Sequence, residues 1–131
     1  MSDEELLRLA SEVRERAYAP YSRFKVGAAV VGASGAVYVG CNVENASYPL
    51  CVCAERTAIG TAIAAGERAI SRVVVITDSS PPASPCGGCR QVIWEFGPEA
   101  EVVVAGVNGE QHTTTIRALL PQGFDGVSLR R

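Results

Sequence analysis

The feature of the sequence that most restricts the fold is a continuous run of β-branched residues in the middle of the chain. The segment from Arg72 to Asp78 reads Arg-Val-Val-Val-Ile-Thr-Asp. Such a run is typical of a strand that is covered on both faces. Helical patterns flank it over 53–66 and 86–96, and a further strand is predicted over 101–107. Strands that alternate with helices indicate βαβ units, so we predict a partly parallel sheet with helices on both faces.

The remaining segments complete a three-layer arrangement. Residues 3–17 form an amphipathic helix, with Ser2 or Asp3 as its cap and Pro20 as its end. The other predicted elements are strands over 25–32, 36–41 and 111–115, a loop over 42–52, a helical turn over 116–120, and a tail that contains Phe124. In the helix over 53–66, the predicted buried residues are Ala58, Ile59, Ala62, Ile63 and Ala65. The predicted fold class is α/β: one domain, residues 1–131, with three α-β-α layers around a mixed sheet of about five strands.

Composition and charge exclude several classes of protein. The chain has 131 residues, of which 47% are hydrophobic and 20% are charged, and this ordinary globular composition excludes wholesale disorder. With 12 basic and 14 acidic side chains, its net charge is −2, so we expect no nucleic acid polymer as a partner. No apolar run approaches the roughly 18 residues of a membrane span, and the acidic N-terminus lacks the order of a signal peptide. We therefore expect a soluble, cytoplasmic protein that does not bind membranes.

The cysteines give the first functional signal, and there are five of them: Cys41, Cys51, Cys53, Cys86 and Cys89. An odd number cannot pair completely in disulfides, and clustered cysteines in a reducing compartment indicate a metal or catalysis. Cys53 opens one predicted helix, and Cys86-Gly87-Gly88-Cys89 opens the next. If the strands before these helices are neighbours, both helix N-termini lie at the carboxyl edge of the sheet, where open α/β folds bind ligands. Three thiolates favour zinc and leave its fourth position open, which is a catalytic arrangement.

Two charged residues beside Cys53 fit such a zinc site. Glu55 lies two positions after Cys53, and a carboxylate next to zinc-bound water can accept its proton and pass it on. Three thiolates on a zinc dication leave a net negative charge, which weakens the metal as a Lewis acid. A guanidinium at Arg56 that donates hydrogen bonds to the sulfurs would offset this charge.

The motifs around these cysteines occur in the order of a known family. The combination of Cys53-Ala54-Glu55 with Pro85-Cys86-Gly87-Gly88-Cys89 is a signature of zinc deaminases. The further motifs are Tyr21-Ser22-Arg23-Phe24-Lys25-Val26-Gly27, Gly40-Cys41-Asn42-Val43-Glu44-Asn45-Ala46-Ser47-Tyr48 and Leu119-Leu120-Pro121-Gln122-Gly123-Phe124. With these motifs, the chain resembles the small homotetrameric cytidine deaminases from about residue 5 to about residue 125.

The resemblance implies a cytidine deaminase-like fold and a zinc-dependent activity. One zinc ion per chain would be held by Cys53, Cys86 and Cys89, and zinc hydroxide would attack C4 of the cytosine ring. Glu55 would shuttle the proton to N3 and then to the departing amine. The implied reaction converts cytidine and 2′-deoxycytidine to uridine and 2′-deoxyuridine plus ammonia, in pyrimidine salvage.

The resemblance also assigns the substrate contacts. Asn42 and Glu44 would bind the ribose hydroxyls, which suits a carboxylate because it only accepts hydrogen bonds. Phe24 would pack against the pyrimidine, and Ala54 would offer backbone contacts to the base amide. The family builds each site across the subunits of a homotetramer, so Tyr48 and Phe124 would serve the pocket of a neighbouring chain.

Other roles for the same residues stay open at this point. The three cysteines could form a structural zinc site with Cys51 or Cys41 as the fourth ligand. Cys86 and Cys89 could instead be a redox pair of the thioredoxin kind. The aromatic residues assigned to the site could be ordinary core or interface residues.

Other functions are also compatible with parts of the pattern. A blasticidin S-type deaminase shares the zinc motif but would not need Asn42 and Glu44. A polynucleotide deaminase would need a basic channel with stacking aromatics, which the net charge of −2 disfavours. A non-catalytic, zinc-stabilised binding module would have no use for Glu55.

Overall fold

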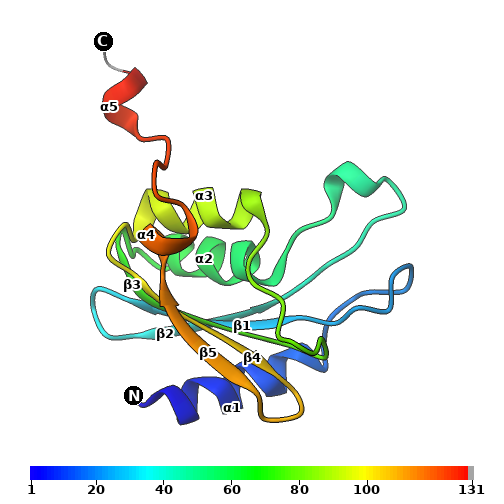
Figure 1. Cartoon of the computed structure of the whole chain (residues 1–131). Helices are drawn as coiled ribbons and strands as arrows, with labels where there is room; N and C mark the ends of the chain where they lie inside the picture. Colours follow the sequence, from blue (N-terminus) through cyan, green and yellow to red (C-terminus); the bar gives the residue numbers. More distant parts are fainter. Residues whose placement is uncertain (130–131) are drawn as a thin grey trace.

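A mixed sheet of five strands lies between two layers of helices in the computed structural model, which describes residues 1–129 (Figure 1). The strands are β1 Gly27–Gly32, β2 Val37–Cys41, β3 Ile70–Thr77, β4 Glu101–Gly106 and β5 Gln111–Thr115. The helices are α1 Asp3–Arg14, α2 Ala54–Ala64, α3 Gly87–Phe96, α4 Ile116–Leu119 and α5 Gly126–Leu129, with a 3₁₀ helix, η1, at Tyr48–Leu50. The predicted α/β class with a mixed five-stranded sheet is confirmed. Within residues 1–129, no helix is long and apolar enough to cross a membrane.

The direction of the strands determines where the helices begin. The strand order is β2-β1-β3-β4-β5; β3 and β4 are parallel, and the other neighbouring pairs are antiparallel. The strands before α2 and α3 are not neighbours, so the condition considered in the sequence analysis is not met: β1 lies between β2 and β3. Since β1 is antiparallel to both of them, β2 and β3 nevertheless run in the same direction. Helices α2 and α3 therefore begin at the same edge of the sheet (Figure 1).

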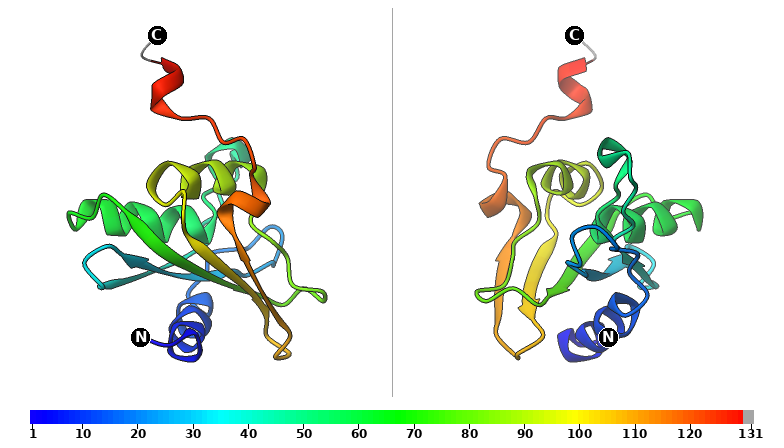
Figure 2. Two further views of the ribbon diagram at one scale, coloured as in Figure 1. Left: turned by 60° about the vertical axis from the view of Figure 1, so that its left-hand side comes forward. Right: turned by 90° about the vertical axis from the view of Figure 1, so that its right-hand side faces the viewer.

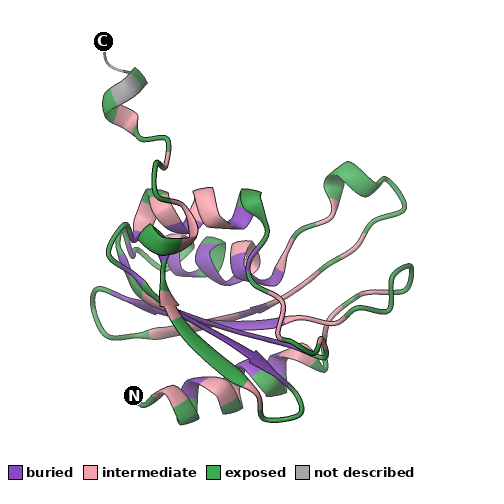
Figure 3. Ribbon diagram, viewed as in Figure 1, coloured by how far each residue is buried: buried purple, intermediate pink, exposed green. Residues whose placement is uncertain are grey.

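The β-branched run in β3 is covered on both faces, as its sequence predicted. Val73 and Val75 belong to the core cluster between the sheet and helices α2 and α3. Val74 and Ile76 belong to the cluster on the opposite face, where α1 contributes the fully buried Leu6. The two side views show α1 on one face of the sheet and α2 and α3 on the other (Figure 2), and the central strands between them are buried (Figure 3).

Two helix ends differ from the predictions. Helix α1 ends at Arg14 rather than at residue 17, because the chain must leave the helix for Tyr18 to pair with Val43 in the 42–52 segment. Ala65, predicted to be buried, is exposed, because α2 ends at Ala64 and Ala65 is only its C-cap. The segment predicted as a tail also contains a short helix, α5.

A close contact with β2 fixes the first turns of α2. A Cβ atom added to Gly40 of β2 would lie 2.4 Å from the Ala58 backbone nitrogen and 2.8 Å from the Ala54 carbonyl oxygen. These are backbone atoms of a helix packed in the core, so they cannot move aside without shifting the helix. Only glycine permits α2 to approach the strand this closely.

Replacing Gly40 with alanine should push the first turns of α2 away from the sheet. We expect Gly40→Ala to lower the free energy of unfolding by about 1–3 kcal/mol, the usual cost of overpacking a core, as measured by urea denaturation. Gly60→Ala in α2 is the matched control, because a Cβ at Gly60 meets no atom within 4 Å. A Gly40→Ala variant as stable as the parent would contradict this account of the packing.

Candidate functional site

The three cysteines predicted as metal ligands lie together where α2 and α3 begin. Cys53 is the N-cap of α2 and Cys86 is the N-cap of α3, where its Sγ accepts a hydrogen bond from the Cys89 N–H at 3.5 Å. The three Sγ atoms all lie within 4.8 Å of one another. Neither Cys41 nor Cys51 belongs to this group in the described part of the chain, and the Cys51 Sγ contacts the backbone of the 42–52 loop instead.

The spacing and chemistry of these sulfurs fit a zinc ion. Two sulfurs bound to a tetrahedral zinc at about 2.3 Å lie about 3.8 Å apart, and the Sγ atoms of Cys53 and Cys86 are 3.9 Å apart. Hydrogen bonds from Cys89, Arg56 and Cys86 lower the pKa of the Cys53 thiol to about 5, although its burial acts in the opposite direction. The hydrogen bond to Cys53, together with burial, raises the pKa of the Cys89 thiol. A divalent cation that binds thiolates would stabilise the ionised form of all three groups.

Arg56 places a positive charge beside the cysteine sulfurs. Its Nη2 donates a hydrogen bond to the Cys53 Sγ at 3.6 Å and another to the Cys51 carbonyl oxygen at 3.3 Å. The hydrogen bond to Cys53 raises the pKa of Arg56 above its usual value, so the guanidinium stays charged. From this position it can offset the negative charge of neighbouring thiolates.

Glu55 is a buried carboxyl group next to the cysteines. It is the second residue of α2, its exposed fraction is 4%, and it lines the same cavity as Cys53 and Cys86. Burial raises the pKa of Glu55 to about 6, and the negative charge of Cys53 acts in the same direction. A hydrogen bond from its own backbone N–H and the charge of Arg56 lower the pKa in part. A carboxyl group with this pKa can both accept and release a proton near neutral pH.

The cavity beside Glu55 has a volume of about 260 Å³. It brings together most of the predicted site residues: Phe24, Asn42, Glu44, Cys53, Ala54, Glu55 and Cys86. Cys89 is fully buried and is not among the lining residues. Residues distant in the sequence therefore meet at one opening, at the edge of the sheet where α2 and α3 begin.

Sequence reasoning missed half of the cavity wall. The additional lining residues are Val26, Cys51, Val52, Val75, Thr77, Ala83 and Ser84. Thr77 ends β3, and Ala83 and Ser84 belong to the loop that follows. The rule that α/β folds bind ligands beyond the carboxyl ends of their strands is the one signal that could have indicated these three residues.

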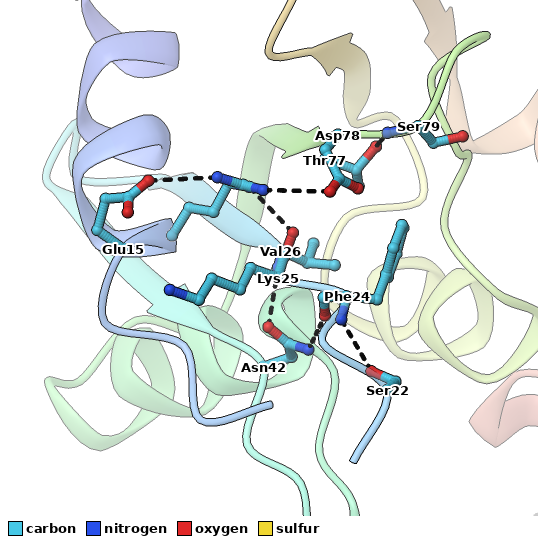
Figure 4. Close-up of polar contacts among 10 residues, drawn as sticks. Glu15, Ser22, Phe24, Lys25, Val26, Asn42, Thr77, Asp78 and Ser79 are labelled. Atoms are coloured by element: carbon cyan, nitrogen blue, oxygen red, sulfur yellow. Dashed lines mark hydrogen bonds and ion pairs between the residues drawn. The ribbon is translucent and has the colours of Figure 1, made fainter. Parts of the chain in front are cut away.

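Asn42 uses its side-chain amide to hold one wall of the cavity (Figure 4). Its Oδ1 accepts a hydrogen bond from the Val26 N–H at 2.8 Å, and its Nδ2 donates one to the Phe24 carbonyl oxygen at 2.7 Å. These two bonds fix the backbone over 24–26, where both Phe24 and Val26 line the cavity.

Tyr48 and Phe124 do not line the cavity of their own chain. The exposed fraction is 62% for Tyr48, in η1, and 55% for Phe124. The backbone of Phe124 is held by Gln91, whose Nε2 donates to the Phe124 carbonyl oxygen at 2.7 Å and whose Oε1 accepts from its N–H at 3.1 Å. The preceding Gly123 lies so close to the Trp94 ring that a Cβ there would be 2.3 Å from a ring carbon. The segment that carries Phe124 is thus fixed on α3, while the Phe124 side chain remains exposed.

Comparison with known proteins gives one consistent result. Residues 1–107 match the family described as "Cytidine and deoxycytidylate deaminase zinc-binding region". A cytidine deaminase of Sporosarcina psychrophila is 43% identical over 125 residues, which cover 95% of this chain and 92% of the relative. A cytidine deaminase of Halalkalibacterium halodurans is 43% identical over 125 residues, which cover 95% of both. The crystal structure of cytidine deaminase from Burkholderia pseudomallei superposes with a TM-score of 0.91 at 50% identity, over 95% of this chain and all 100% of that chain.

The zinc content of cysteine variants tests the roles of the sulfurs. We expect about one zinc per chain in the purified parent and in Cys41→Ser. Cys86→Ser should retain a small fraction of that amount after dialysis against a chelator, because two thiolates hold zinc far less tightly than three. Zinc is measured by atomic absorption, and circular dichroism checks that each variant is folded. Full zinc content in Cys86→Ser would contradict the assignment.

Proposed function

This chain belongs to the cytidine deaminase family, whose members are hydrolases, and we propose that it deaminates cytidine and 2′-deoxycytidine to uridine and 2′-deoxyuridine with release of ammonia. The observation that carries this proposal is one cavity that is lined by the buried Glu55 carboxyl group and by two of the three clustered cysteines. The residues that line this cavity include two carboxyl groups and no lysine or arginine. An uncharged nucleoside is better suited to such a cavity than a polyanionic nucleic acid.

Cys53, Cys86 and Cys89 hold one zinc ion in the proposed enzyme. When bound, zinc supplies the Lewis acidity that makes a water molecule nucleophilic near neutral pH. Arg56 offsets part of the negative charge of the three thiolates through its hydrogen bond to the Cys53 Sγ. The cysteines and Arg56 thereby act together to keep the bound metal acidic.

Glu55 moves the protons of the proposed reaction. Its carboxylate accepts a proton from the water that attacks C4 and delivers it to N3 of the cytosine ring. It then transfers the second proton of that water to the amino group, the C4–N4 bond breaks, and ammonia leaves as C4 becomes a carbonyl. The burial of Glu55 supports this role, because bulk water is kept from the group that exchanges the proton.

Four residues of the cavity bind the substrate in the proposed enzyme. Asn42 and Glu44 bind the hydroxyls of the sugar, since an ionised carboxylate accepts hydrogen bonds from such donors. Phe24 packs against the pyrimidine ring, and the Ala54 backbone contacts the amide edge of the base. All four residues line the same cavity as Glu55, which supports these roles.

Four chains assemble in the proposed enzyme, and Tyr48 and Phe124 of one chain complete the cavity of a neighbour. The exposure of both side chains and their absence from the cavity of their own chain support this arrangement. The enzyme acts on free nucleosides in the cytoplasm, in pyrimidine salvage. A reducing compartment suits it, because the zinc ligands must remain free thiols.

Replacing Glu55 with glutamine tests the proton transfer. Glutamine has nearly the same shape but cannot accept and release a proton, so we expect Glu55→Gln to lower kcat for cytidine by roughly 10²- to 10⁴-fold. The loss of ultraviolet absorbance as cytidine becomes uridine measures the rate. Zinc content is the control, and it should equal that of the parent. Turnover within about tenfold of the parent would contradict the role of Glu55.

The solution mass and mixed assemblies test the shared cavity. Sedimentation equilibrium should give a mass near four times the 13.8 kDa of one chain. Glu55→Gln and Phe124→Ala chains, each impaired alone, should regain activity when co-expressed, because some cavities then combine an intact Glu55 with an intact Phe124 from a neighbour. A monomer at micromolar concentration, or no gain of activity in the mixture, would contradict the shared cavity.

A further inference from the structure

Ser22 binds two of the residues that the proposed function assigns to the substrate, although it does not itself line the cavity. Its Oγ donates a hydrogen bond to Oε2 of Glu44 and accepts one from the Phe24 N–H at 3.0 Å (Figure 4 draws the contact with Phe24). One hydroxyl group therefore joins the carboxylate assigned to the sugar to the backbone that carries the ring assigned to the base.

The turn around Ser22 is built to hold the Glu44 carboxylate. Oε1 of Glu44 also accepts hydrogen bonds from the backbone N–H groups of Tyr21 at 3.0 Å and Ser22 at 3.1 Å. Together these donors lower the pKa of Glu44, with the Ser22 hydroxyl making the largest contribution. Arg23 has a φ of 60°, in the left-handed region. The backbone turns back at this residue, so that the Phe24 N–H faces the Ser22 hydroxyl. The carboxylate, the turn and Phe24 are thus one connected unit.

The chain contains a second unit of the same design, remote from the cavity. Ser34 donates from Oγ to Oε2 of Glu67 and from its N–H to Oε1 at 3.3 Å, and its Oγ accepts from the Ala36 N–H at 3.2 Å. Ser22 precedes β1 and Ser34 follows it, so the two units lie at opposite ends of that strand. Neither Ser34 nor Glu67 lines the cavity. Ser34 and its hydrogen bonds therefore serve as a control: their loss would affect the stability of the fold but not a residue that lines the cavity.

We infer that Ser22 is a positioning residue for nucleoside binding: its hydroxyl holds Glu44 and Phe24 in a fixed relation, so that sugar and base are bound together. This inference rests on the proposed function. Without the hydroxyl, Glu44 keeps its two backbone donors but loses its link to the Phe24 backbone, and the cavity wall between them is free to rearrange. The hydrogen bonds of Ser22 do not reach Glu55 or the cysteines in the described structure. The loss should therefore weaken substrate binding and leave the chemical step intact.

Steady-state kinetics of three zinc-loaded variants test this role with cytidine as substrate. Ser22→Ala should raise KM about tenfold and change kcat by less than about twofold, as expected when a hydrogen bond to a charged binding group is lost. Ser22→Thr keeps a hydroxyl and should restore KM to near the parent value. Ser34→Ala loses the matching hydrogen bonds at the other end of β1, so it should lower the melting temperature and leave KM unchanged.

Several outcomes would overturn the inference while the parent enzyme is active. These are an unchanged KM in Ser22→Ala, an effect confined to kcat, or a rise in KM of the same size in Ser34→Ala, which would indicate general loosening of the fold. Failure of Ser22→Thr to restore KM would also overturn it. A zinc-loaded parent that does not convert cytidine would overturn the proposed function and this inference with it, and that result is distinct from an active parent whose Ser22→Ala variant keeps its KM.

Discussion

The close approach of α2 to strand β2 at Gly40 decides where the sulfur cluster can form. The backbones of Ala54 and Ala58 lie directly against this glycine, and Cys53 immediately precedes that turn as the N-cap of the helix. Helix α3 begins at the same edge, because β3 runs in the same direction as β2. The position of the α2 N-terminus is thus set by the packing of its backbone against β2, and this packing also positions the Cys53 thiol.

Much of the fold could be predicted, because its strongest signals are local. The β-branched run of β3 indicated burial on both faces, and its side chains indeed divide between two core clusters. The place of β1 between β2 and β3 could not be predicted in this way, since it depends on pairing between segments about forty residues apart, which periodicity does not encode. The end of α1 was missed for the same reason, because the pairing of Tyr18 with Val43 ends it.

In the candidate site, too, the residues in local motifs could be predicted, and those placed by the tertiary fold could not. Cys53, Glu55 and Cys86 could be identified because each lies at the start of a helix in a motif with its own chemistry. Thr77 and Ser84 carry no such motif, and they line the cavity only because β3 ends there. The contacts of Ser22 with Glu44 could not be predicted from the sequence either, since they join two irregular loops. The roles of Tyr48 and Phe124 remain predictions, because they concern a second chain.

The first turns of α3 contribute both to the cysteine cluster and to the attachment of the C-terminal segment. Cys86 and Cys89 open the helix, and the next two residues hold the C-terminal segment: Arg90 donates to the Leu119 carbonyl oxygen at 2.9 Å, and Gln91 holds the backbone of Phe124. In the proposed tetramer, a metal that orders these turns would also order the segment that faces a neighbouring chain, and contact with that neighbour would order the turns in return. Metal affinity and subunit affinity would then be linked, and binding of either would raise the affinity for the other by the same factor.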